Sequence, residues 1–187
     1  MTCSRNADTV RGRLKSETIS VHQEVEGALE KLSCFETPQG FAVYLRAMRD
    51  CHQRFSATEP HVAKRCGFQP SSVEVVNAIV RDLKRLEEGT HEAEAEVQLS
   101  ASADEAWGIQ YALQGSAMGA RMLKPRSVAF FADGKPSEYL SILVDLGSER
   151  WSRFVKELGL ANPNPALAIA GARTVFETVL SNLNRQN

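Results

Sequence analysis

The chain has 187 residues, of which 43% are hydrophobic and 24% charged, the composition of a soluble globular protein with a sizeable core. Its formal net charge of -1 argues against a general nucleic-acid-binding protein and against binding to anionic membranes. The N-terminal stretch has no apolar run that could serve as a signal peptide, and no segment reaches the length of a membrane span. We therefore expect a cytoplasmic protein with one domain over residues 1–187 and a core at about 10–184.

The four cysteines do not form a recognisable metal site. They stand at Cys3, Cys34, Cys51 and Cys66, a spacing that matches no CxxC or paired zinc pattern. Disulfides are not expected without a secretory signal. We interpret these residues as reduced, partly buried thiols.

The first third of the chain has the periodicity of amphipathic helices. Apolar or small side chains recur at intervals of three and four in the first of them: Leu14, Thr18, Val21, Val25 and Leu29. Thr37-Pro38 is typical of a helix start, with an N-cap followed by proline in the first turn. We expect this second helix to continue to the region of Pro60.

Two capping boxes predict the next two helix starts. Ser71 with Glu74 precedes "VEVVNAIVRDLKRLEEG", where Gly89 supplies the stop, and Ser102 with Glu105 opens a helix over 103–123.

A turn-rich connection follows that helix, and two shorter helices are expected over 137–147 and 149–158, the second ended by Gly159. Asn164-Pro165 begins a last helix that runs close to the C-terminus. No sustained alternation of β-branched and polar residues is present. The sequence therefore predicts an all-α fold.

The 103–123 helix contains a strip almost without side-chain volume. Positions 108, 112, 115 and 119 share one helical face, and they are Gly, Ala, Gly and Gly, with Ser116 and Ala120 beside them. Each interior glycine destabilises a helix by about 1 kcal/mol relative to alanine, so a close neighbour must require it. That neighbour is either another helix, packed through a small-xxx-small motif, or a flat, rigid ligand.

A histidine in the first helix favours the ligand. Lys15, Thr18, His22 and Glu26 form one seam, and His22 is either a core residue or a metal ligand. Glu26, one turn ahead, can hold a ring N–H and fix the tautomer, as partners of metal-bound histidines do. Lys15 lies two turns behind, about 10 Å along the axis. A histidine, a displaced cation and a bare facing helix together indicate a slot for haem.

Several segments resemble haem oxygenases, in the right order and over roughly residues 10–180. "LKSETISVHQEVE" resembles the proximal-helix motif of that family, and "YALQGSAMGARML" resembles its glycine-rich distal helix. "RDLKRLEEG", "AWGIQYALQGS" and "ERWSRFVKEL" are similar to the bacterial branch. The resemblance implies a single-domain multi-helix fold that holds haem between a proximal and a distal helix. It also implies a biliverdin-producing enzyme that uses haem as substrate and cofactor, consumes O₂ and electrons, and releases CO and Fe²⁺.

The same resemblance assigns roles on the proximal side and at the haem edge. His22 would be the axial iron ligand, with Glu26 to orient it and Thr18 beside it. Lys15 and Tyr111 would bind haem propionates.

On the distal side, Gly115 and Gly119 match the glycines that let the helix bend over the iron. Ser116 stands where animal members carry an aspartate, so the water network that delivers protons must be anchored differently. Ala120 replaces the second glycine of the usual pair, a small change.

Further propionate partners are expected in the C-terminal half, where Arg150 and Arg153 are the candidates. The alternative is that both arginines are ordinary solvated surface residues. An external electron donor, a reductase or ferredoxin, is implied, and a photoreceptor could accept the biliverdin. Two alternatives stay open: a non-catalytic haem-binding protein for storage, delivery or sensing, and a helical interaction module in which His22 is only a core residue.

Overall fold

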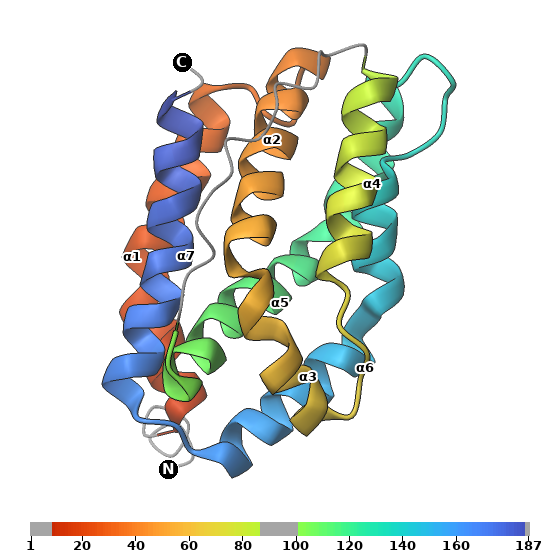
Figure 1. Cartoon of the computed structure of the whole chain (residues 1–187). Helices are drawn as coiled ribbons and strands as arrows, with labels where there is room; N and C mark the ends of the chain where they lie inside the picture. Colours follow the sequence, from red (N-terminus) through yellow and green to blue (C-terminus); the bar gives the residue numbers. More distant parts are fainter. Residues whose placement is uncertain (1–8, 87–100, 186–187) are drawn as a thin grey trace, which may run out of the picture.

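The computed structural model describes residues 9–86 and 101–185, and within these ranges the secondary structure is helical, without a strand (Figure 1). The all-α prediction is confirmed. No described helix is both long and apolar enough to cross a membrane. The α-helices are α1 (Val10–Lys31), α2 (Pro38–Phe55), α3 (Glu59–Cys66), α4 (Ser72–Arg85), α5 (Ala103–Ser127), α6 (Glu138–Ala161) and α7 (Pro165–Arg185), with short 3-10 helices η1 (Ser56–Thr58) and η2 (Val128–Phe130).

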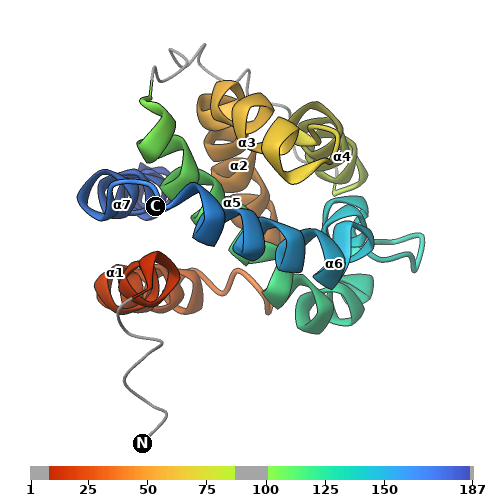
Figure 2. The same cartoon turned by 90° about the horizontal axis from the view of Figure 1, so that it is seen from below.

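The central helix of the arrangement is α5. It packs against α7 along its N-terminal part and against α6, while α1 packs mainly on α7 (Figure 2). On the other side, α2 packs on α4 and α4 on α6. Viewed from below, α1 and the C-terminal half of α5 lie on the same side of the molecule, with α7 beside α1 and α6 beside α5 (Figure 2).

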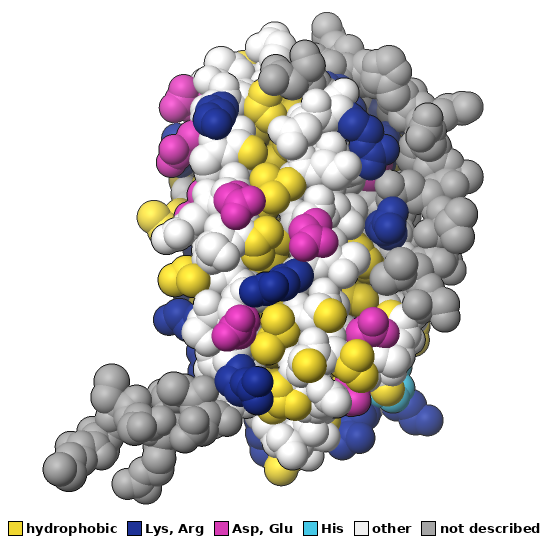
Figure 3. Space-filling model, turned by 90° about the vertical axis from the view of Figure 1, so that its left-hand side faces the viewer, with side chains coloured by type: hydrophobic (Ala, Val, Ile, Leu, Met, Phe, Trp, Pro, Cys, Tyr) yellow, Lys and Arg dark blue, Asp and Glu magenta, His cyan; other side chains and the backbone are white. Residues whose placement is uncertain are grey.

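The side formed by α1 and α7 has a mixed surface. Acidic and basic side chains stand among small apolar groups, so the visible part of this face has no extended field of one sign (Figure 3). One contact that joins the two helices is the pair Arg173 and Glu17, in which the guanidinium donates to the Glu17 carbonyl oxygen at 3.0 Å.

Three of the four predicted helix starts form as expected. At the last of them, the start of α7, the Asn164 side-chain oxygen accepts a hydrogen bond from the Ala166 backbone N–H at 3.0 Å. The Thr37 hydroxyl accepts a hydrogen bond from the Gly40 backbone N–H at 3.0 Å. Ser102 and Glu105 form a reciprocal capping box: the Glu105 N–H donates to the serine hydroxyl at 3.2 Å, and the Ser102 N–H donates to the Glu105 carboxylate at 2.8 Å.

The predicted capping box of Ser71 and Glu74 is wrong, although a helix does begin at this point. The Ser71 hydroxyl makes no bond to its own helix and donates instead to Glu59 Oε1 at 2.9 Å. A buried carboxylate twelve residues earlier in the chain therefore takes the place of the local cap. The predicted stop at Gly89 lies outside the described residues.

The two helices predicted over 137–147 and 149–158 are present as the two halves of α6, although the second half ends later than predicted. Gly147 interrupts α6 with φ 68° and ψ -179°, a conformation that favours glycine, so the break separates the two expected helices. The second one passes Gly159 and ends at Asn162, which adopts the left-handed conformation. Helix α5 continues to Ser127, past Pro125, four residues beyond its predicted end.

Candidate functional site

His22 lies on the exposed part of α1. Leu14 and Thr18 are buried beneath the same seam, whereas the His22 side chain is 53% exposed. The interpretation of His22 as a core histidine is therefore wrong. Its Nδ1 lies 3.5 Å from Glu26 Oε1, and its ring meets the Phe176 ring of α7 edge-on, with centroids 5.5 Å apart. Because Glu26 occupies the Nδ1 side, the imidazole is oriented to offer Nε2 to a ligand.

Thr18 has a structural bond of its own. Its buried hydroxyl donates to the Leu14 carbonyl oxygen at 2.8 Å, one turn earlier in the helix. Because the hydroxyl proton is used in this bond, Thr18 stabilises the turn of α1 that precedes His22.

The glycine strip of α5 divides into two parts with different neighbours. A Cβ at Gly108 would come within 1.7 Å of the Ala168 carbonyl oxygen, and one at Gly171 within 2.3 Å of the Glu105 carbonyl oxygen. These two glycines therefore allow α5 and α7 to cross with their backbones in contact. A Cβ at Gly115 would only touch the Trp151 ring, at 3.8 Å, and one at Gly119 would meet nothing within 4 Å.

The open part of the strip is flanked by exposed apolar side chains. Met118 is 52% exposed and Met122 78%, next to the exposed Gly119. Met118 also lines a small cavity of about 40 Å³ between α5 and α6, at the Gly147 break. Ala120, in contrast, is buried, so its methyl group packs into the core.

At the other end of the strip lies Tyr111 of α5, which is within electrostatic reach of Arg11 of α1. The half-buried Tyr111 ring packs on Trp151 with centroids 5.7 Å apart. Burial raises the pKa of the Tyr111 hydroxyl, and the positive charge of Arg11 opposes this effect. Arg11 is one turn before the exposed Lys15 on α1, so this end of α1 carries two exposed cations, of which Arg11 acts on the Tyr111 hydroxyl. Arg11 was not among the predicted site residues, although its spacing of four from Lys15 continues the seam.

Arg150 and Arg153 are placed elsewhere. The buried Arg150 guanidinium pairs with Glu59 at 2.7 Å and lies 3.7 Å over the Phe68 ring. It also donates to the Gln69 carbonyl oxygen and the Gln114 side chain.

The exposed Arg153 pairs with Glu149 on its own helix and reaches toward the Gly67 carbonyl oxygen at 3.5 Å. The structure thus does not bring either arginine to His22, Lys15 or Tyr111.

A buried polar group lies behind Ser116. Tyr139 of α6 is fully buried, and its hydroxyl lies 3.4 Å from His52 Nε2 of α2. Burial and the neighbouring Tyr44 raise the pKa of the Tyr139 phenol well above its usual value, with Ser116 acting in the opposite direction. Burial lowers the pKa of His52 to about 4, opposed by the charge of Glu59. At neutral pH these side chains are therefore uncharged hydrogen-bonding groups.

His52 and Tyr139 were not among the predicted site residues. His52 stands in the apolar stripe of α2, which favours a core role, and its contact with Tyr139 joins positions 87 residues apart. The Ser116 hydroxyl itself donates to the Leu113 carbonyl oxygen at 2.7 Å, as serines inside helices often do. The only local signal for the contact between His52 and Tyr139 was the presence of a histidine within the apolar stripe of α2.

The arrangement fits a haem group. It combines an exposed histidine backed by a carboxylate, a helix without side-chain volume at Gly119, exposed apolar side chains beside it, and cations at one edge. Porphyrin is flat and apolar with two carboxylates at one edge, so these features match its faces, its iron and its rim.

Comparison with known proteins supports the architecture. The chain matches no protein-family model and no curated protein. Its structure is similar to that of the haem oxygenase from Neisseria meningitidis, described in its NO- and CO-bound forms. The similarity has a TM-score of 0.72 and covers 96% of this chain and 92% of that chain, at 23% sequence identity. The chain therefore has the fold of a bacterial haem oxygenase.

Proposed function

We propose that this protein binds haem between α1 and the C-terminal half of α5 and degrades it, with O₂ and electrons, to biliverdin, CO and Fe²⁺. Two observations carry the proposal: the exposed, carboxylate-backed His22 on α1 and the open surface at Gly119 in the C-terminal half of α5. These two helical segments lie on the same side of the molecule (Figure 2). A core histidine would be buried, and a helix-packing glycine would have a backbone neighbour, as Gly108 has.

In this proposal, each end of the site has a separate task. His22 would bind the iron through Nε2, with Glu26 fixing its orientation. Arg11, Lys15 and Tyr111 would pair with the propionates and so set how the ring is rotated in its own plane, and with it which meso carbon is oxidised. Arg150 and Arg153 are left out of this set, because their guanidinium groups are bound to Glu59 and Glu149.

Bound haem would supply the iron at which O₂ is activated and the ring carbon that is oxidised. The distal side chains would then act by shape and hydrogen bonding. Gly115 and Gly119 leave room above the ring plane, and Ser116, with Tyr139 and His52 behind it, offers uncharged donors and acceptors that can hold ordered water. These three residues are our candidates for the distal network that the serine in place of aspartate requires.

Haem degradation consumes electrons, so an external electron donor is part of this proposal. We propose a reductase or ferredoxin as the donor, and a cytoplasmic setting in which that donor is available. A photoreceptor that accepts biliverdin is the proposed consumer of the pigment.

The test begins with haemin titration into the protein, followed by absorption spectroscopy. Reconstitution with ferredoxin, its reductase and NADPH in the presence of catalase should then bleach the haem bands and yield biliverdin, identified by chromatography. If no haem complex forms, the result favours the alternative in which this protein is a helical interaction module. A stable complex that produces no pigment would identify a haem-binding protein for storage, delivery or sensing. His22→Ala serves as the matched control for iron ligation.

A further inference from the structure

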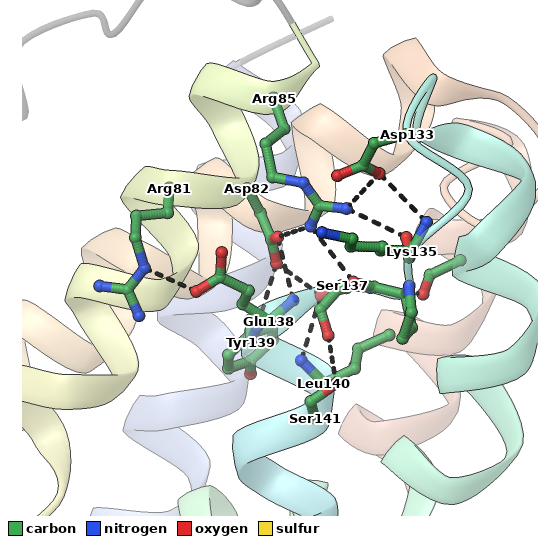
Figure 4. Close-up of polar contacts among 12 residues, drawn as sticks. Arg81, Asp82, Arg85, Asp133, Lys135, Ser137, Glu138, Tyr139, Leu140 and Ser141 are labelled. Carbon is green, nitrogen blue, oxygen red and sulfur yellow. Dashed lines mark hydrogen bonds and ion pairs between the residues drawn. The ribbon is translucent and has the colours of Figure 1, made fainter.

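A buried network at the other end of α5 is not part of the site described so far. Its centre is Asp82 of α4, which is fully buried (Figure 4). Its carboxylate accepts hydrogen bonds from the Ser137 hydroxyl at 2.6 Å and from the backbone N–H groups of Glu138 and Tyr139, each at 3.0 Å. Arg85 donates a fourth, at 2.8 Å. Asp82 thus binds the otherwise unpaired N–H groups at the start of α6.

The same network reaches the end of α5 through a pair of serines. The Ser137 N–H donates to the Ser127 hydroxyl at 2.9 Å, and that hydroxyl donates to the Lys124 carbonyl oxygen at 2.7 Å. Ser137 also caps α6 by accepting from the Leu140 N–H at 3.1 Å. Consequently the last turn of α5 and the first turn of α6 are held to one carboxylate.

Arg85 ties the intervening connection to this centre. Its guanidinium donates to Asp133 at 2.7 Å and to the Lys135 carbonyl oxygen (Figure 4). It also donates to the Pro136 carbonyl oxygen and lies 3.9 Å over the Phe131 ring. The charge of Asp82 is therefore compensated inside the protein by a partner that also orders residues 131–136.

This network gives α5 a second fixed point. The first is the crossing at Gly108, where the backbone meets Ala168. Between the two fixed points lie Gly115 and Gly119, and Pro125 removes one backbone hydrogen bond near the second. This stretch is intrinsically weak as a helix, so its path over the site depends on how firmly both ends are held.

We propose that Asp82 is a positioning residue for the distal side of the site: it anchors the end of α5 and holds the Tyr139 hydroxyl next to Ser116 and His52. The link to Tyr139 is short, because Asp82 binds the backbone N–H of the residue whose hydroxyl lies 3.4 Å from His52 Nε2. The anchoring of α5 is a property of the protein without ligand. The effect on bound haem rests on the function proposed above.

The decisive variant is Asp82→Asn, which keeps the size of the side chain but replaces one acceptor oxygen by an NH₂ group that cannot accept. Leu83→Ala, on the same helix and equally buried, is the control for general loss of stability. Arg81→Gln removes only the exposed ion pair with Glu138 and controls for the loss of an ion pair next to the network.

The first measurement is amide hydrogen exchange of the protein without haem. In Asp82→Asn, amides from Gly119 to Ser127 should exchange about tenfold faster relative to those near Gly108, whereas Leu83→Ala should affect both regions alike. Parallel acceleration in the two variants would overturn the anchoring proposal. If Asp82→Asn does not fold, Ser127→Ala, which removes only the tie between α5 and Ser137, should give the same local pattern.

The second measurement is the pH at which the absorption spectrum of the ferric haem complex changes as iron-bound water loses its proton. A positioning role predicts that Asp82→Asn shifts this pH in the direction that Tyr139→Phe does, whereas Leu83→Ala and Arg81→Gln leave it in place. An unshifted pH in Asp82→Asn would limit Asp82 to a structural role. Failure of the wild-type protein to bind haem would refute the proposed function, while the exchange experiment would still decide the anchoring.

Discussion

Gly108 and Ala168 are in backbone contact: a Cβ on the glycine would come within 1.7 Å of the alanine carbonyl oxygen. Gly119, three turns further along the same helix, would give a Cβ no neighbour within 4 Å. Both explanations of a glycine strip thus apply to one helix, the packing explanation at its start and the ligand explanation toward its end.

This division predicts opposite stability effects for two alanine variants. Gly108→Ala forces α5 away from α7, and because the obstructing atoms are backbone, no side-chain rotation relieves the clash; we expect a loss of about 3 kcal/mol or more. Gly119→Ala should raise stability without haem by up to about 0.8 kcal/mol through helix propensity. Urea unfolding of both variants without ligand provides the measurement. A clear loss of stability in Gly119→Ala would mean that the glycine packs against protein.

Filling the same space with a larger side chain separates stability from function. Gly119→Leu should keep the stability of the haem-free protein near that of the wild type, because the leucine has room and a better helix propensity. With haem it should weaken or distort O₂ binding and reduce turnover. Thermal melts without haem and spectra of the O₂ complex with haem provide the two measurements. A lower melting temperature of haem-free Gly119→Leu than of the wild type would contradict the interpretation of Gly119 as an open surface.

Most of the helices and most of their starts were predictable because their signals are local, whereas α3 was not predicted and α2, α5 and α6 end at other residues than expected. Thr37 and Ser102 cap the helices that follow them, and Gly147 breaks α6, since each needs only its immediate neighbours. Ser71 did not behave as a cap because Glu59, distant in sequence, competes for its hydroxyl. A capping signal holds only where tertiary contacts do not offer the same side chain a better partner.

Prediction of the site residues was limited in the same way, because local pairs could be anticipated and tertiary contacts could not. His22 with Glu26 could be anticipated, since one helical turn joins them. Arg150 could not be placed, because a sequence does not show which carboxylate takes its guanidinium. Asp82 did leave a signal: it falls on the apolar face of α4, where a charged residue must find buried partners.

Removing the proposed iron ligand should change the spectrum without unfolding the protein. His22 is largely exposed, so His22→Ala loses little packing, and the melt without haem should stay close to that of the wild type. The Soret and visible bands of the haem complex should become those of a water-ligated or weakly ligated iron. Added imidazole should partly restore the wild-type bands. Identical spectra of wild type and variant would show that His22 is not the ligand.

At the haem edge, the predicted effect is on orientation. Lys15 and Arg11 are exposed cations, and exposed ion pairs contribute at most about 1 kcal/mol each, so loss of one should weaken haem binding only slightly. The double variant Lys15→Ala, Tyr111→Phe should instead change the ratio of biliverdin isomers, because the propionates seat the ring in its plane. Arg153→Ala, whose partner is Glu149, is the matched control. An unchanged isomer ratio and unchanged haem affinity in the double variant would remove both residues from the site.

The last prediction concerns acid stability and His52. Its folded-state pKa of about 4 lies below the value of 6.5 for a free histidine, because burial disfavours the imidazolium. Between these values the unfolded chain binds the proton and the folded protein does not, so stability rises with pH from about 4 to about 6.5 and is lost as the pH falls through this window. A difference of about 2.5 pKa units corresponds to roughly 3 kcal/mol at full extent. Urea unfolding at several pH values should show this dependence in the wild type and in His61→Gln, which alters an exposed histidine, and a weaker dependence in His52→Gln. Parallel curves for wild type and His52→Gln across this window would show that the folded protein binds the proton on His52 as readily as the unfolded chain does, which would contradict the lowered pKa.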